Sequence, residues 1–377
     1  MSSNITTARA AATILLIAGA PMALADAPTI DPADDAKHFG PLDRVMFWEP
    51  AQKVAGFRNA ERLFLTRRIE AGDTPYPLPD SPVDLSPMQF EYRGESYGFA
   101  DYIKKSNVAG LIVIQDGKVL DESYYLGNSR NTRWVSFSVT KSLTSMLLGA
   151  AIEDGYIGDL DEAITDYLPR LKGSLYDGVT IRNLLQMASG IDWNEDYEDP
   201  QSDVNTYPWY DVLALFGYLD DKQRVAAPGA EFRYNSAETD LVGSVVRAAI
   251  GNNLSTYLEK KIWKPFGMES DTNWLLGAAG GAEIGGCCVS ATLRDYARIG
   301  LFALRGGELP DGTRVLPSGW MRESTTPSAA FRGYGFLWWL NDDGSYEARG
   351  VFGQTVYINP RLNLVIAKHA VWDKAFD

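Results

Sequence analysis

The placement of strand-like segments on both sides of a helix-rich stretch most constrains the fold of this chain. Residues 109–126, AGLIVIQDGKVLDESYYL, are typical of a hairpin, because apolar runs flank Asp116-Gly117, a pair that tolerates positive φ. Residues 160–284 instead carry apolar side chains every three to four positions, as amphipathic helices do. Strand-like runs then return, separated by turn residues: GYGFLWWL, SYEARG, QTVYINP and LNLVIAKHAV. Strands from both ends can share one antiparallel sheet, so the sequence predicts an α+β fold with a mostly helical inserted subdomain at about 160–284.

The first hundred residues have a different character. Arg9 precedes the apolar run AAATILLIAGA, and small residues surround a cleavage point at Ala23-Leu24-Ala25. We interpret residues 1–25 as a signal peptide and expect a secreted or periplasmic protein; an uncleaved, loosely anchored N-terminal helix is the alternative. The apolar run is too short for a membrane span and no later segment comes closer, so no stable span is expected after signal removal. Residues 26–100 are predicted to be irregular, and residues 101–377 to form the main domain.

Composition excludes several kinds of partner. The net charge is −14 and no basic run compensates it, so we expect no nucleic-acid binding. His38 and His369 are the only two histidines, which rules out a His-rich metal site, and the carboxylates show no recognisable metal-ligand spacing. Cys287 and Cys288 are adjacent and cannot close a long loop; we interpret them as small buried residues in a Gly-Gly turn, with a catalytic thiol as the alternative. Neither a metal nor another cofactor is therefore expected.

The segment SVTK, which opens an apolar helix ending near Gly155, suggests a nucleophile with its own base. Ser138 and Lys141 are three residues apart, so on a helix their side chains share a face. A serine hydroxyl becomes an effective nucleophile when a neighbouring base takes its proton. A buried lysine can be that base, because desolvation lowers its pKa. A helix-start serine with a surface lysine is the alternative, and since S-x-x-K also arises by chance, its context must decide.

Two later segments supply that context. In PGAEFRYNSAETDLVG, Tyr234 follows a Pro-Gly turn and precedes a helix, so its phenol would be presented from a loop and could relay a proton; a buried tyrosine with one hydrogen bond is the alternative. In EARGVFGQTVYINP, glycines open an apparent strand and permit close approach of a ligand to the backbone. The backbone N–H groups of Val351 and Ser138 would then form an oxyanion hole.

In combination, SVTK, PGAEFRY and the Gly-rich strand followed by GQ and an N-P turn resemble the serine β-lactamase and penicillin-binding family. The segments LLQMASGIDWNEDY, YGFLWW and VFGQTVYINP resemble its esterase and 6-aminohexanoate-dimer hydrolase branch. The resemblance covers about residues 100–370. It implies a β-lactamase/transpeptidase-like fold in which residues 101–377 are the catalytic domain. It also implies that Ser138 accepts the acyl group, Lys141 is its general base and Tyr234 relays protons.

The chain departs from the family pattern at two motifs. The second motif is usually Tyr-x-Asn but reads Tyr234-Asn235-Ser236, so Ser236 would take the place of the amide near the lysine or substrate. The third is usually Lys or His, any residue, then Gly, but reads Ala348-Arg349-Gly350. We expect Ala348 and Gly350 to face the substrate side without a charge that could hold a carboxylate. Relatives commonly add a closing helix after the last strand, and the sequence as given stops soon after its last strand-like run.

The sequence therefore predicts a serine hydrolase that cleaves a small-molecule ester or amide through an acyl-enzyme. A catalytically inert, penicillin-binding-like protein that only binds ligands is the first alternative, because a fold alone does not guarantee turnover. An α/β-hydrolase is the second, but no G-x-S-x-G occurs and His369 lies inside a strand-like run. Residues 192–199, DWNEDYED, could line the cleft and attract a cationic amine through Asp192 and Tyr197, or they could be a solvated acidic loop.

Overall fold

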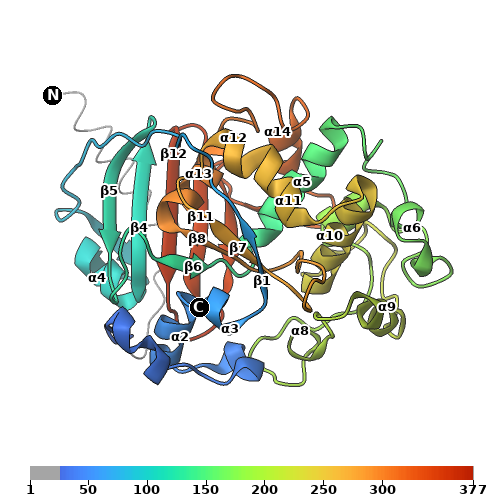
Figure 1. The fold of residues 1–377 in the computed structure, drawn as a ribbon, viewed down its shortest axis with the longest axis horizontal. Helices are drawn as coiled ribbons and strands as arrows, with labels where there is room; N and C mark the ends of the chain where they lie inside the picture. The colour runs from blue at the N-terminus through green and yellow to red at the C-terminus, as the bar shows by residue number, and fades with distance from the viewer. Residues whose placement is uncertain (1–25, 377) are drawn as a thin grey trace.

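The computed structural model describes residues 26–376, so the predicted signal peptide lies outside the described part of the chain. The main sheet consists of β4 (Val108–Gln115), β5 (Lys118–Tyr124), β9 (Trp339–Leu340), β10 (Tyr346–Gly350), β11 (Gln354–Asn359) and β12 (Leu364–Ala370). Its strands are antiparallel and run in the order β5-β4-β12-β11-β10-β9, so β12 sits between the hairpin and the C-terminal strands (Figure 1). The predicted sheet built from both ends of the chain is confirmed.

Strand β4 is buried on both faces, which explains why its sequence is continuously apolar. Ile112 and Ile114 face one hydrophobic cluster, whereas Leu111 and Val113 face another, so both sides of the strand are buried. Helix α13 (Leu293–Leu304) covers one face, and α4 (Phe99–Lys105) with the hairpin β2 (Gln89–Tyr92) and β3 (Glu95–Gly98) covers the other. At the hairpin turn Asp116 and Gly117 have φ of 52° and 74°, as predicted.

The helical subdomain lies beside the sheet (Figure 1). Its long elements are α5 (Val139–Glu153) and α10 (Ser236–Ile250), which pack on each other, while α5 also packs on β10. Gly155, in the left-handed conformation with φ 76°, follows the end of α5 as predicted. The remaining helices are short: α6 (Ile164–Tyr167), η3 (Pro169–Leu171), α7 (Ile181–Leu185), α8 (Asp203–Thr206), α9 (Val212–Asp220), α11 (Leu254–Leu258), η4 (Glu259–Trp263), α12 (Lys264–Phe266) and α14 (Trp320–Ser324).

A second sheet, which the sequence did not predict, has four strands in the order β1-β7-β8-β6. They are β1 (Thr66–Ile69), β7 (Thr272–Leu275), β8 (Val289–Thr292) and β6 (Arg133–Val135). Strands of three or four residues are too short for a two-residue alternation to stand out. The strand β7 was therefore not predicted, and it lies within the stretch that the sequence indicated to be mostly helical. Of the predicted strand GYGFLWWL, only Trp339–Leu340 is a strand.

The N-terminal segment is more ordered than the expected irregular stretch. It contains η1 (Pro32–Lys37), η2 (Leu42–Phe47), α2 (Pro50–Phe57) and α3 (Ala60–Leu63). The Phe57 ring packs edge-on against Phe137 with centroids 4.9 Å apart, and against Trp134 at 5.8 Å. Short proline-rich helices carry too few turns for a helical period to be recognised from sequence. This packing places η2 and α2 beside the loop that enters α5.

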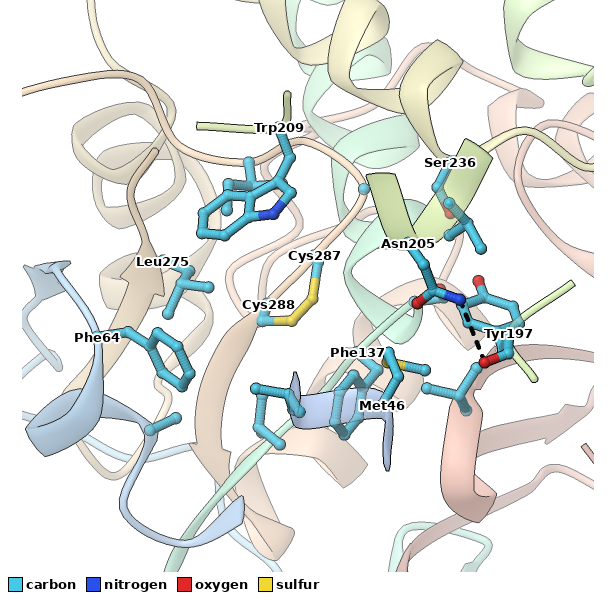
Figure 2. Close-up of a pocket in the computed structure, with 18 of the residues that line it drawn as sticks. Met46, Phe64, Phe137, Tyr197, Asn205, Trp209, Ser236, Leu275, Cys287 and Cys288 are labelled. Atoms are coloured by element: carbon cyan, nitrogen blue, oxygen red, sulfur yellow. Dashed lines mark hydrogen bonds between the residues drawn. A yellow bond between two sulfur atoms is a disulfide. The ribbon is translucent and has the colours of Figure 1, made fainter. Parts of the chain in front are cut away.

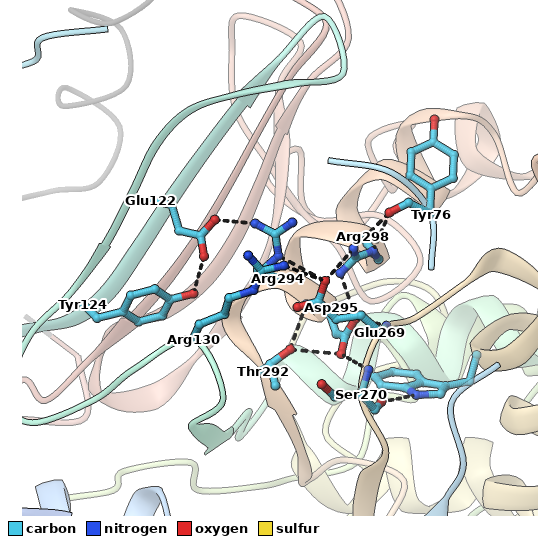
Figure 3. A network of polar contacts seen from close by, with 11 residues as sticks. Tyr76, Glu122, Tyr124, Arg130, Glu269, Ser270, Thr292, Arg294, Asp295 and Arg298 are labelled. Atoms are coloured by element: carbon cyan, nitrogen blue, oxygen red, sulfur yellow. Dashed lines mark hydrogen bonds and ion pairs between the residues drawn. The ribbon is translucent and has the colours of Figure 1, made fainter. Parts of the chain in front are cut away.

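A buried polar network joins the two sheets (Figure 3). Arg298 on α13 pairs with Glu269, just before β7, at 2.8 Å and with Asp295 at 3.1 Å. Arg294 pairs with the same Glu269 at 3.1 Å and with Glu122 on β5. Buried charges require such partners, so the network fixes α13 between the main sheet and the β7 region. None of the helices within residues 26–376 has the length and apolar character needed to cross a bilayer.

Candidate active site

Ser138 stands at the N-terminal end of α5, and Lys141 lies one turn further along the same face. The Lys141 Nζ donates to the Ser138 Oγ over 3.2 Å, to the Ser236 Oγ over 3.0 Å and to the Gly286 carbonyl over 2.9 Å. Only 2% of the Lys141 surface is exposed. All three partners are neutral oxygens, so the amine is held in place without a carboxylate in direct contact.

The electrostatics of this site favour a lysine that can release its proton. Burial lowers the pKa of the Lys141 amine, because desolvation disfavours the ammonium form. The negative charges of Glu195 and Asp240 act in the opposite direction and raise the pKa. Burial raises the pKa of Asp240 to about 6, which the Gly286 N–H, donating to its carboxylate over 2.8 Å, partly offsets. A neutral Lys141 can accept the proton of the Ser138 hydroxyl.

The backbone on both sides of the site is unusual. Phe137, just before Ser138, and Phe352, just after Val351, have φ of 45° and 62°. These values lie in the left-handed region, which residues other than glycine seldom adopt. Their rings pack edge-on with centroids 5.5 Å apart. Gly350 allows the close approach of β10, because a Cβ there would lie 2.4 Å from the Ser136 carbonyl. Strained residues of this kind concentrate at active sites, where the surrounding packing holds them.

Tyr234 lies in the loop before α10 and is half-buried. Its ring stacks on Trp339 with centroids 5.5 Å apart, and the Lys141 Nζ is 5.4 Å from the ring centroid. Burial raises the pKa of the phenol, and a hydrogen bond with Ser138 partly offsets this rise. The fold thus brings together the three residues that the sequence predicted to be catalytic.

A cavity of about 440 Å³ opens at Ser138 and Lys141. Figure 2 shows Phe137, the joined side chains of Cys287 and Cys288, and apolar side chains from the N-terminal segment along its wall. Ser236, Tyr197 and Val351 also line it. Among residues 26–376, no cluster of three or more His, Cys, Asp or Glu side chains could hold a metal ion.

A β-lactamase family model matches residues 99–374, which is most of the chain. The chain belongs to the β-lactamase family. It is therefore a hydrolase of the serine type, with the antiparallel-sheet fold that the sequence predicted.

Individual relatives agree with this assignment. The chain is 34% identical over 287 residues to the 6-aminohexanoate-dimer hydrolase of Paenarthrobacter ureafaciens, covering 70% of this chain and 72% of that one. Among solved structures, a Bacillus anthracis protein provisionally named 6-aminohexanoate-dimer hydrolase aligns with a TM-score of 0.76 and 21% identity, covering 86% and 89% of the two chains. A family VIII carboxylesterase aligns with a TM-score of 0.58 and 18% identity, covering 72% and 89%.

The altered second motif of this β-lactamase-family enzyme has a clear structural basis. The Ser236 hydroxyl occupies the position beside Lys141, and the preceding Asn235 side chain instead caps α10 by accepting from the Glu238 N–H over 3.2 Å. Ser236 also donates its hydroxyl proton to Glu195, and its backbone N–H donates to the same carboxylate over 3.1 Å. Ser236 therefore connects Lys141 to a carboxylate.

Glu195 is a site residue that the sequence analysis missed. Besides Ser236, its carboxylate accepts from the Tyr197 hydroxyl over 2.6 Å and from the Trp193 indole N–H. The sequence suggests substrate binding by this acidic loop through Asp192 and Tyr197, but nothing in the loop's composition distinguishes Glu195 from its four other carboxylates. Gly286 was missed as well: a Cβ there would lie 3.1 Å from the Lys141 Nζ, so a glycine allows the lysine to reach its carbonyl.

Other predicted residues lie away from the cavity. Asp192 is exposed and forms an ion pair with Arg233 at 3.1 Å. Ala348 is buried in the core with 2% exposure, whereas Arg349 packs over the Trp339 ring at 5.4 Å. His369 is buried against Trp134, and desolvation lowers its pKa to about 3, which suits a structural residue.

Proposed function

We propose that this enzyme hydrolyses an ester or amide through an acyl-enzyme on Ser138. The observation that carries the proposal is the buried Lys141 amine, 3.2 Å from the Ser138 hydroxyl and surrounded by neutral partners. In the first step the Ser138 Oγ attacks the substrate carbonyl carbon while its proton passes to the Lys141 Nζ. The carbonyl oxygen becomes an oxyanion, which the N–H groups of Ser138 and Val351 would stabilise.

The tetrahedral intermediate then collapses and the leaving group needs a proton. Tyr234 interacts with Ser138 and lies beside Lys141, so it can pass the lysine's proton to the leaving oxygen or nitrogen. Water next attacks the acyl-enzyme, giving up a proton to the same groups, and Ser138 leaves with its proton restored. Both half-reactions use the same three side chains and no cofactor.

Covalent labelling tests the assignment. The protein is incubated with a fluorophosphonate, and the peptide containing Ser138 is analysed by mass spectrometry. We expect the label on Ser138, none in Ser138→Ala, and unchanged labelling in Ser244→Ala, whose hydroxyl donates to a helical carbonyl on α10. Wild-type turnover by Ser138→Ala would overturn the assignment. A folded wild-type protein that is neither labelled nor active would favour the ligand-binding alternative.

We also propose that the protein is exported and that residues 1–25 are removed, on the strength of the sequence pattern alone. Mass spectrometry of protein recovered outside the cytoplasm should find a mature N-terminus near Asp26; an intact Met1 would contradict export by this route.

A further inference from the structure

We infer that the cavity beside Ser138 binds an uncharged aliphatic acyl chain, so the preferred substrates are esters or amides of medium-length fatty acids. This inference rests on the proposed function and specifies its substrate. The apolar wall is the first observation, and Figure 2 shows its members around one cavity. Most of the side chains beyond Ser138 are aromatic, aliphatic or sulfur-containing, among them Met46, Phe64, Phe137, Trp209, Leu275, Cys287 and Cys288. Besides Ser138, the uncharged polar side chains in the lining are those of Tyr197, Asn205, Tyr207 and Ser236.

The second observation is the distribution of charge along the cavity. Its charged lining residues are Asp43, Arg44 and Lys141. Asp43 and Arg44 are exposed at the rim, and Lys141 is turned toward Ser138 and Ser236. An ammonium or carboxylate at the end of a substrate chain would therefore lose its hydration without gaining a buried partner of opposite charge, which is costly.

The third observation assigns the cavity to the acyl side of the substrate. Tyr234, the group that would protonate the leaving group, is not among the residues that line this cavity. The leaving group must face Tyr234, so the part of the substrate that enters the cavity is the part that stays attached to Ser138. The cavity therefore receives the acyl chain.

The fourth observation concerns where this wall comes from. Met46 and Phe64 belong to the N-terminal segment, which precedes the matched family region at residues 99–374. The catalytic residues all fall inside that region. The N-terminal segment therefore adds a specificity-determining wall to a catalytic centre of the common family type.

Chain length provides the first test. We would measure kcat/KM for p-nitrophenyl acetate, butyrate, hexanoate and heptanoate. Burial of one methylene favours binding by about fourfold, so kcat/KM should rise by on the order of a hundredfold from acetate to hexanoate. The p-nitrophenyl ester of 6-aminohexanoate has nearly the length of the heptanoate but ends in an ammonium, and should react at least about tenfold more slowly than the heptanoate.

Variants test the wall itself. Met46→Asp should reduce the hexanoate-to-acetate ratio of kcat/KM at least about tenfold, because a carboxylate in the wall disfavours the aliphatic chain that hexanoate has and acetate lacks. Val225→Asp is the matched control: this residue is also an apolar side chain, 47% exposed, but outside the cavity lining, and the ratio should not change.

The outcomes separate the inference from the proposed function. If acetate is hydrolysed through Ser138 but longer esters gain nothing, or the aminohexanoate ester reacts as well as the heptanoate, the acyl-chain inference is wrong and the serine mechanism stands. A gain seen only when the alcohol portion is lengthened would also overturn the acyl assignment. If neither ester hydrolysis nor labelling of Ser138 occurs, the proposed function itself is wrong.

Discussion

Replacing Glu195 with glutamine should move the pH dependence of activity to lower pH. Glu195 is connected to Lys141 through the Ser236 hydroxyl, by one hydrogen bond of 3.0 Å and one shorter contact. Its negative charge raises the pKa of Lys141, whose neutral form is the proposed base. Activity therefore rises with pH as Lys141 loses its proton. Removal of the charge lowers that pKa, so the rise should begin at lower pH.

The geometry gives the size of the effect. Two successive hydrogen bonds place the carboxylate within about 5.5 Å of the amine. At that separation the interaction is about 3 kcal/mol for an effective dielectric constant of about 20, and below about 1 kcal/mol in bulk water. Since one pH unit corresponds to about 1.4 kcal/mol, the midpoint of the profile should move by about half a unit to two units.

The assay is kcat/KM for a p-nitrophenyl ester, measured across the pH range in which wild-type activity rises. Asp192→Asn is the matched control, because it removes the same charge from the same loop at an exposed residue paired with Arg233. Its midpoint should stay at the wild-type value. An unmoved midpoint in Glu195→Gln, or an equal movement in Asp192→Asn, would refute the reasoning.

Three further predictions follow from the site and its surroundings. Tyr234→Phe should lower kcat by roughly 10²–10⁴, and an unchanged rate would make this residue structural. Lys141→Arg should be inactive at neutral pH, since a guanidinium does not give up its proton; restored activity would mean that only the positive charge matters. Burial raises the pKa of Glu238 from 4.5 to about 8, so the stability it contributes is full below about pH 4.5 and is lost as pH rises through 8. The melting temperature of Glu238→Gln should therefore exceed that of the wild type more at pH 9 than at pH 5, and equal differences at both pH values would contradict this.

Local patterns made the main sheet and the pairing of Ser138 with Lys141 predictable, because both depend on residues close in sequence or on a clear period. The Ser138–Lys141 contact needs only one helical turn, and the β4–β5 hairpin needs only Asp116-Gly117 between two apolar runs. The third partner of Lys141 is the Gly286 carbonyl, 145 residues away, and no spacing rule connects the two.

Long-range contacts also explain what the sequence could not show around the cavity. Ser236 was predicted as a site residue, but its carboxylate partner Glu195 lies 41 residues earlier in an acidic loop of similar residues. Met46 and Phe64 lie at the cavity in an N-terminal segment that Phe57 packs against Phe137 and Trp134. Such contacts are set by tertiary packing of apolar surfaces, which carries no local signature.

The position of β12 has a consequence for the order in which the molecule can be assembled. Among residues 26–376 this strand is the last, yet it pairs with β4 on one side and β11 on the other. A ribosome adding 5–20 residues per second would finish β4 on the order of ten to fifty seconds before β12. During that interval the edge of β4 that later pairs with β12 has no strand beside it, and an unpaired apolar edge is the kind of surface that templates aggregation. A chain interrupted before Leu364 would carry the proposed catalytic residues Ser138 and Lys141 without the central strand of the main sheet, so we expect activity only after β12 has been made.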